Sequence, residues 1–93
     1  MAEIITKESL IIDLKVLIET FIMEKNKNED LKYILFRLEE EKILLENDQI
    51  TDITDVVPIV DRNDYYACSK FYFQNLARRI LMYNGELASK SLI

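Results

Sequence analysis

The chain has 93 residues, of which 49% are hydrophobic, and it carries a net charge of −5 at pH 7. This length fits one domain, and the apolar fraction is high enough for a buried core, which excludes an intrinsically disordered chain. The chain has no histidine, one cysteine and one glycine. These counts exclude histidine-based catalysis, standard zinc sites and glycine-rich phosphate loops, so we expect a non-enzymatic protein with no metal and no cofactor.

A first helix is predicted over residues 7–25. Thr6 is a good N-cap, and Ile5 and Leu10 stand at the positions of a hydrophobic staple around it. Apolar residues then recur at three- and four-residue steps, which places them on one face of a helix. That main face consists of Leu10, Leu14, Leu17, Ile18 and Phe21.

A second helix is predicted over residues 29–46, after a short polar turn that ends in the N-cap residue Asn28. A turn of this length predicts an antiparallel helical hairpin. The main apolar face of this helix consists of Leu31, Ile34, Leu35, Leu38 and Leu45. Arg37 with Glu41 and Glu39 with Lys42 have the spacing of same-face ion pairs.

The connector over residues 47–61 has a different composition. Isoleucine, valine, threonine and aspartate dominate it, which favours extended chain over helix. Pro58 excludes a central strand, because proline cannot donate a ladder hydrogen bond. A helical turn that begins at Thr51 or Thr54 remains an alternative, and the sequence does not decide between strand, short helix and loop.

A third helix is predicted over residues 62–84. Asp61 is the expected N-cap, and Gly85, the only glycine, is the expected left-handed residue that ends the helix. Residues 86–93 form a short tail. The predicted buried face consists of Tyr65, Ser69, Tyr72, Leu76, Ile80 and Tyr83.

Together these elements predict a single all-α domain over residues 1–93. We expect a small antiparallel bundle of three main helices, with an extended connector between the second and the third. The lone cysteine, the lack of a long apolar run and the lack of a signal-peptide pattern favour a cytoplasmic protein.

The first two predicted helices each carry a second apolar stripe, which a monomeric bundle does not need. Such exposed patches mark interaction sites, so we expect a protein–protein interaction module, a small regulator or inhibitor that acts as a homodimer and binds an unidentified protein. The alternative is that residues 48–60 and the C-terminal tail cover these stripes. The expected interface consists of Ile12, Val16, Met23, Tyr33, Phe36, Ile43 and Leu44.

Acidic residues gather between residues 39 and 55. They suit a patch that meets a basic protein or imitates a nucleic-acid backbone, although such a group is also typical of a solvated helix end. Its members are Glu39, Glu40, Glu41, Glu46, Asp48, Asp52 and Asp55.

The third helix offers an alternative function. Lys70, Arg78 and Arg79 lie among aromatic residues, a combination that binds single-stranded nucleic acid by stacking and charge neutralisation. The competing interpretation is that the aromatic residues form the core and the basic residues pair with acids on the second helix.

Overall fold

The computed structural model describes residues 5–24, 27–63, 65 and 67–91, with side chains up to residue 86. Within these residues the regular structure is helical, and no strand is present, which confirms the all-α class for the described part of the chain. The elements are α1 (Lys7–Ile22), α2 (Glu29–Glu46), the 3₁₀ turn η1 (Thr54–Val56), α3 (Val57–Asp61) and α4 (Ala67–Ser91).

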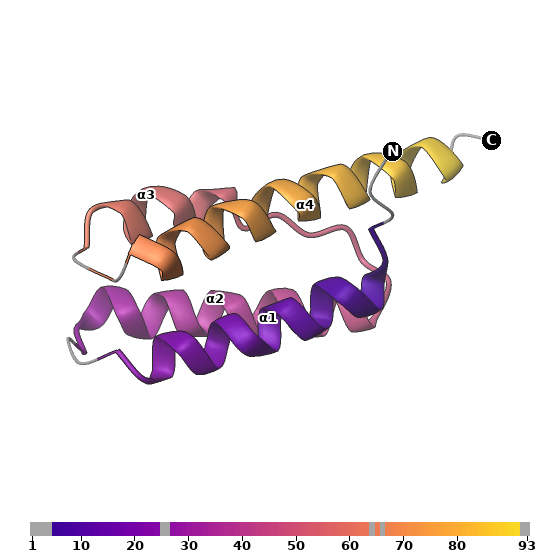
Figure 1. Ribbon diagram of the computed structural model, residues 1–93. Coiled ribbons are helices and arrows are strands. Elements are labelled where there is room, and N and C mark those ends of the chain that lie inside the picture. Colours follow the sequence, from indigo (N-terminus) through magenta and orange to yellow (C-terminus); the bar gives the residue numbers. More distant parts are fainter. Residues whose placement is uncertain (1–4, 25–26, 64, 66, 92–93) are drawn as a thin grey trace.

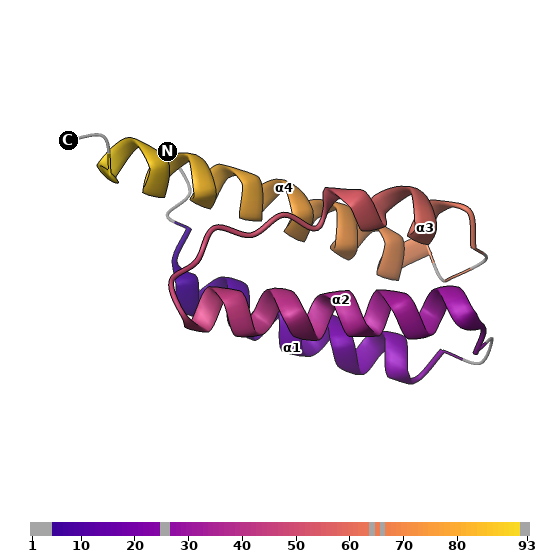
Figure 2. The same ribbon diagram turned by 180° about the vertical axis from the view of Figure 1, so that it is seen from behind.

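The helices form two layers. In Figures 1 and 2, α1 and α2 lie side by side in one layer, and α3 and α4 form a second layer that packs over them. The core fills the space between the layers, where Leu14, Ile34 and Ile80 are completely buried. Phe21 of α1 lies at the centre of an aromatic cluster, with its ring centroid 5.3 Å from that of Tyr65 and 6.4 Å from that of Phe73. Both contacts are edge-to-face, the geometry that aromatic quadrupoles favour.

The start of α1 follows the prediction. The backbone N–H of Ser9 donates to Thr6 Oγ1 at 3.1 Å, and both staple residues, Ile5 and Leu10, are buried. The predicted end at residue 25 was too late. The helix ends at Ile22, because the N–H of Glu24 bonds to the carbonyl of Phe21, three residues back, and tightens the last turn. Lys25 lies outside the described residues.

Helix α2 has the predicted bounds, and its first turn is capped by Asn28 Oδ1, which accepts from the N–H of Leu31 at 2.9 Å. Its end is a Schellman motif. The N–H of Gln49 bonds to the carbonyl of Leu44 at 2.9 Å. Asp48 occupies the left-handed position with φ of 58°, where glycine is the usual residue.

The extended connector was predicted correctly only in part. Residues 49–53 have no regular structure, but residues 54–61 form η1 and then α3. The side chain of Asp52 nucleates this turn, because its Oδ1 accepts from the N–H of Thr54 at 2.8 Å and from its hydroxyl at 2.6 Å. Pro58 lies in the first turn of α3, where a missing N–H removes no helical hydrogen bond.

The predicted start of the third helix was also wrong. Asp61 is the last residue of α3 rather than the N-cap of α4, and α4 begins at Ala67. Asn63, after the end of α3, donates its side-chain amide to the carbonyl of Ile59 at 2.7 Å. Tyr65, between α3 and α4, is buried against Phe21. Asp64 and Tyr66, which the sequence placed inside the helix, lie outside the described residues.

Gly85 does not end α4. The helix continues through Gly85 to Ser91, and φ of Gly85 is not positive, so residues 86–91 of the predicted tail are helical. The last two tail residues, 92 and 93, lie outside the described part. A glycine near a predicted helix end is a sound local signal, but among the described residues the one with positive φ is Asp48.

We expect Gly85→Ala to raise the free energy of unfolding by about 0.5–1 kcal/mol, because alanine restricts the unfolded chain and meets no atom within 4 Å.

Asp48→Gly should relieve about 1 kcal/mol of left-handed strain, partly offset by the loss of the exposed Lys7–Asp48 ion pair at 2.8 Å. Urea denaturation of both variants measures these changes. A destabilised Gly85→Ala variant would show that Gly85 ends the helix after all.

Asp30 joins the first turn of α2 to the residues after α3. Its carboxylate accepts from Arg62 at 2.8 and 3.0 Å and from Asn63 Nδ2 at 2.9 Å. The bonds from Arg62, followed by that from Asn63, lower the pKa of Asp30 from 3.8 to about 2. A carboxylate whose pKa is depressed in the folded state stabilises the fold above its unfolded pKa and loses that contribution as the pH falls.

We therefore expect the stability of the wild-type protein to fall between pH 4 and pH 2.5, and Asp30→Asn to fall less steeply over this range. Urea unfolding at a series of pH values measures both slopes. Glu29→Gln, which alters the adjacent residue of the same turn, is the control and should keep the wild-type slope. Identical slopes for wild type and Asp30→Asn would contradict this role of Asp30.

Candidate interaction site

The structure exposes six of the seven residues of the predicted interface. The exposed side chains are Ile12 (59%), Val16 (58%), Met23 (81%), Tyr33 (42%), Phe36 (61%) and Ile43 (55%). Leu44 is half-buried. Leu44 is therefore a minor member of this set.

The exposed residues of α1 and α2 lie on the outer side of one layer. Leu14 is buried in the core, and Ile12 and Val16, two residues before and after it, lie on the opposite face of α1. Phe36 lies on the face of α2 opposite the buried Leu38 in the same way. Helices α1 and α2 lie side by side in one layer (Figure 1), and each stripe lies on the face of its helix opposite the buried residues, with Val16 also bordering α4. We call this set, without Leu44, the outer apolar surface.

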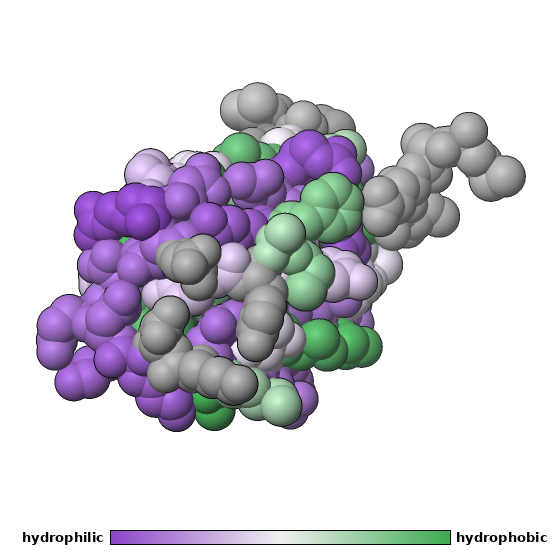
Figure 3. Space-filling model, turned by 60° about the vertical axis from the view of Figure 1, so that its left-hand side comes forward, coloured by the Kyte–Doolittle hydropathy of each residue, from purple (hydrophilic) through white to green (hydrophobic). Residues whose placement is uncertain are grey.

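Helix α4 carries exposed apolar residues that the sequence analysis assigned differently. Tyr72 was predicted to be buried, but its side chain is 64% exposed, and the neighbouring Phe71 is 66% exposed. Their rings touch edge to face, with centroids 6.1 Å apart. Figure 3, which brings the end with both turns forward, shows hydrophobic residues in separate patches within a largely hydrophilic face. The apolar surface of the molecule is thus divided between several faces.

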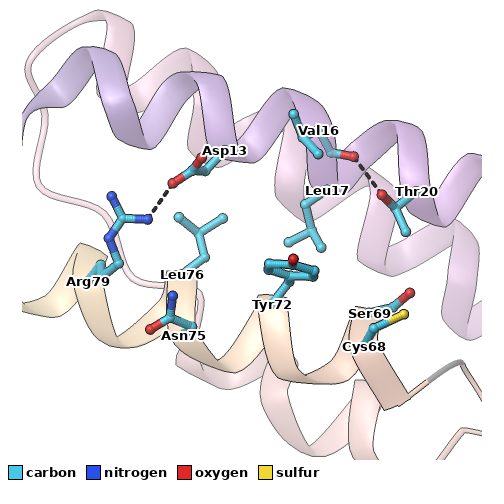
Figure 4. A pocket seen from close by; sticks show the side chains of 10 residues that line it. All are labelled: Asp13, Val16, Leu17, Thr20, Cys68, Ser69, Tyr72, Asn75, Leu76 and Arg79. Atoms are coloured by element: carbon cyan, nitrogen blue, oxygen red, sulfur yellow. Dashed lines mark hydrogen bonds and ion pairs between the residues drawn. The ribbon is translucent and has the colours of Figure 1, made fainter.

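A groove of about 420 Å³ runs between α1 and α4 (Figure 4). Of the predicted interface residues, Val16 lines it. The Asp13–Arg79 ion pair spans one end of the groove, whereas Cys68 and Ser69 lie toward the other end. Its lining consists of Asp13, Val16, Leu17, Thr20, Cys68, Ser69, Tyr72, Asn75, Leu76 and Arg79. The sequence held no signal for this groove, because the two helices that form it are far apart in the chain.

The predicted acidic patch is largely paired within the molecule. Arg37, whose side chain is only 12% exposed, lies 2.5 Å from Glu40, 3.1 Å from Glu41 and 3.0 Å from Asp55. Lys7 binds Asp48 at 2.8 Å. The predicted Glu39–Lys42 and Arg37–Glu41 pairs are both present. The sequence predicted one partner of Arg37, Glu41, whereas the structure shows that Arg37 binds three members of the acidic group.

Glu41 is buried instead of exposed, at 1% of its accessible surface, so it cannot belong to a surface patch. Burial raises the pKa of Glu41, and the adjacent Thr51 and Arg37 oppose that increase. Thr51 in turn pairs with Asn84 of α4. Its N–H donates to Asn84 Oδ1 at 3.4 Å, and its carbonyl accepts from Asn84 Nδ2. A polar chain of contacts thereby connects α2, the connector and α4.

The three basic residues of the nucleic-acid alternative do not converge. Lys70 donates to the carbonyl of Asp61 at the end of α3, at 3.3 Å. Arg79 binds Asp13 of α1, on another side of α4. Arg78 remains exposed and bonds to Asn75 at 2.8 Å within its own helix. The structure therefore distributes these cations between α3, α1 and solvent.

Comparison with known protein families, with characterised proteins and with solved structures finds no match to this chain. None of the described helices has the length and apolar character needed to cross a membrane. Across the described residues, no three acidic or cysteine side chains are grouped as they would be to hold a metal ion.

The raised pKa of Glu41 predicts a pH dependence of stability. A carboxyl group whose pKa is higher in the folded state than its usual 4.5 stabilises the fold when protonated, and this contribution is lost as the pH rises through the folded pKa. We expect Glu41→Gln to gain stability relative to wild type as the pH rises from 4.5 to 8, measured by urea unfolding. Glu40→Gln, whose side chain is half-exposed, is the control. Parallel curves for wild type and Glu41→Gln would contradict the prediction.

Proposed function

We propose that this protein is a non-enzymatic protein–protein interaction module that acts as a homodimer through the outer apolar surface. The observation that carries the proposal is the exposure of six large apolar side chains on the outer side of one layer. Burying such side chains contributes about 1.5–3 kcal/mol each, so leaving them in water is costly for a monomer. We further propose that the helices form an antiparallel bundle, in which α1 and α2 present a continuous outer side.

A second copy is the partner that we propose for this surface. The surface carries exposed charges of both signs, among them Lys15 and Glu19 on α1 and Lys32 and Glu39 on α2. A two-fold axis places the same patch against itself, so each cation can meet an anion of the other copy while the apolar residues pack at the centre.

We further propose that the dimer is a small cytoplasmic regulator or inhibitor, which binds another protein through surfaces that remain free. We do not assign that role to the acidic group, since most of its members already have intramolecular partners. We also do not extend the proposal to nucleic acid, because Lys70 and Arg79 contact different neighbouring elements.

The dimer is tested by light scattering over a concentration series. We expect the wild-type protein to dimerise, and Ile12→Ser combined with Phe36→Ser to weaken the dimer by about a hundredfold, since two central contacts contribute about 3 kcal/mol together. Leu81→Ser, which alters an exposed apolar residue of α4 outside this surface, is the matched control and should dimerise normally. A wild-type protein that remains monomeric at all concentrations would overturn the proposal.

A further inference from the structure

The α1–α4 groove has the dimensions and walls of a small-molecule site. Its volume of about 420 Å³ lies within the usual range for such sites, about 300–1,000 Å³. Leu17 and Leu76 are buried and form the apolar base. Val16 and Tyr72 are exposed on opposite helices and form the two apolar sides (Figure 4). A flat apolar group between these sides would remove both from water.

Ser69 provides one unsatisfied polar group in this groove. The residue is 1% exposed, and its hydroxyl oxygen has no hydrogen-bond partner. Figure 4 shows this hydroxyl directed from α4 toward α1, beside Cys68. A buried hydroxyl without a partner destabilises the folded protein, and a ligand that bonds to it would recover that loss.

The charged groups of the groove point to a neutral ligand. Asp13 and Arg79, the two charged residues of the lining, bind each other across the groove. Arg79 also donates to Ser9 Oγ at 3.5 Å. A charged ligand would have to compete with this ion pair, whereas a neutral one leaves it intact. The hydroxyl of Thr20 already donates to the carbonyl of Val16 at 2.8 Å, and the hydroxyl of Tyr72 belongs to an exposed side chain that water can reach. Ser69 is the hydroxyl of the lining that is buried and without a partner, so it is the group that a ligand would satisfy.

We propose that the α1–α4 groove binds a neutral small molecule with a flat apolar body and one hydroxyl or carbonyl group. The body lies between Val16 and Tyr72 above Leu17 and Leu76, and the polar group bonds to Ser69. This site does not rest on the proposed dimer, because of the residues of the outer apolar surface only Val16 contributes to it.

Three matched probes test the proposal: 4-methylphenol, toluene, which lacks the hydroxyl, and 4-methylbenzoate, which is an anion. Each is added to the 93-residue chain up to about 10 mM, a range suited to the low affinity of such small compounds, while amide NMR signals are recorded. We expect 4-methylphenol to shift the signals of Leu17, Ser69 and Leu76 at the lowest concentration. It should also slow alkylation of Cys68, the only cysteine and an exposed one, by iodoacetamide.

Ser69→Ala separates the polar contact from the apolar groove. We expect this variant to bind 4-methylphenol about five- to tenfold more weakly and toluene unchanged, while its urea midpoint rises, because an unsatisfied hydroxyl is removed. Leu81→Ala, outside both the groove and the outer apolar surface, is the control and should bind all probes as the wild type does. The proposal is overturned if 4-methylphenol causes no shifts at the groove, if the anion binds as well, or if Ser69→Ala leaves the affinity for 4-methylphenol unchanged. Light scattering of the same samples reports separately on the dimer.

Discussion

Arg37 and Glu41 of α2 form the polar contact on which the arrangement of the second half of the chain depends. Both side chains are withdrawn from water, so each needs a charged or hydrogen-bonding partner to offset its desolvation. Arg37 obtains partners from the region after α2, where it binds Asp55 and donates to the carbonyl of Asp52 at 2.9 Å. Thr51, beside Glu41, is bonded to Asn84 of α4. The irregular segment between α2 and η1 is therefore fixed by side chains on both sides of it, which compensates for its lack of regular backbone hydrogen bonds.

The position of α4 follows from this contact and from the aromatic cluster at the other end. Phe21 contacts Tyr65 and Phe73, and Asn84 contacts Thr51. These contacts fix α4 at two places along its length, around Phe73 and around Asn84. This rotation of the helix buries Phe73, Leu76 and Ile80 and turns Tyr72 outward. With Tyr72 outward, the contact between α1 and α4 is incomplete, and the groove is the result. The same packing that stabilises the bundle thus creates the groove.

The outer apolar surface and the groove suit different kinds of binding partner. The outer surface consists of residues that add nothing to the monomer core, and their exposure suits association with a broad apolar face. The groove combines an apolar base with one unsatisfied hydroxyl, which suits a compact ligand with a single polar group. Because Val16 contributes to both, a substitution there would not distinguish them, whereas Ile43 and Ser69 each report on one feature.

The sequence alone determined the features that depend on local chemistry. Thr6 and Asn28 cap their helices with their own side chains, and the spacing of leucine and isoleucine in α1 and α2 predicts which residues are buried. The second stripes could be found in the same way, because one helix face suffices for a core. Tertiary structure decided the rest. Residues 54–61 are helical with Asp55 fixed by Arg37, and α4 continues past Gly85 where Asn84 is held by Thr51. Glu41 is buried rather than exposed, Asp55 pairs with Arg37, and the groove lies between helices more than forty residues apart in the chain. Side chains distant in sequence meet in this way only when the layers pack.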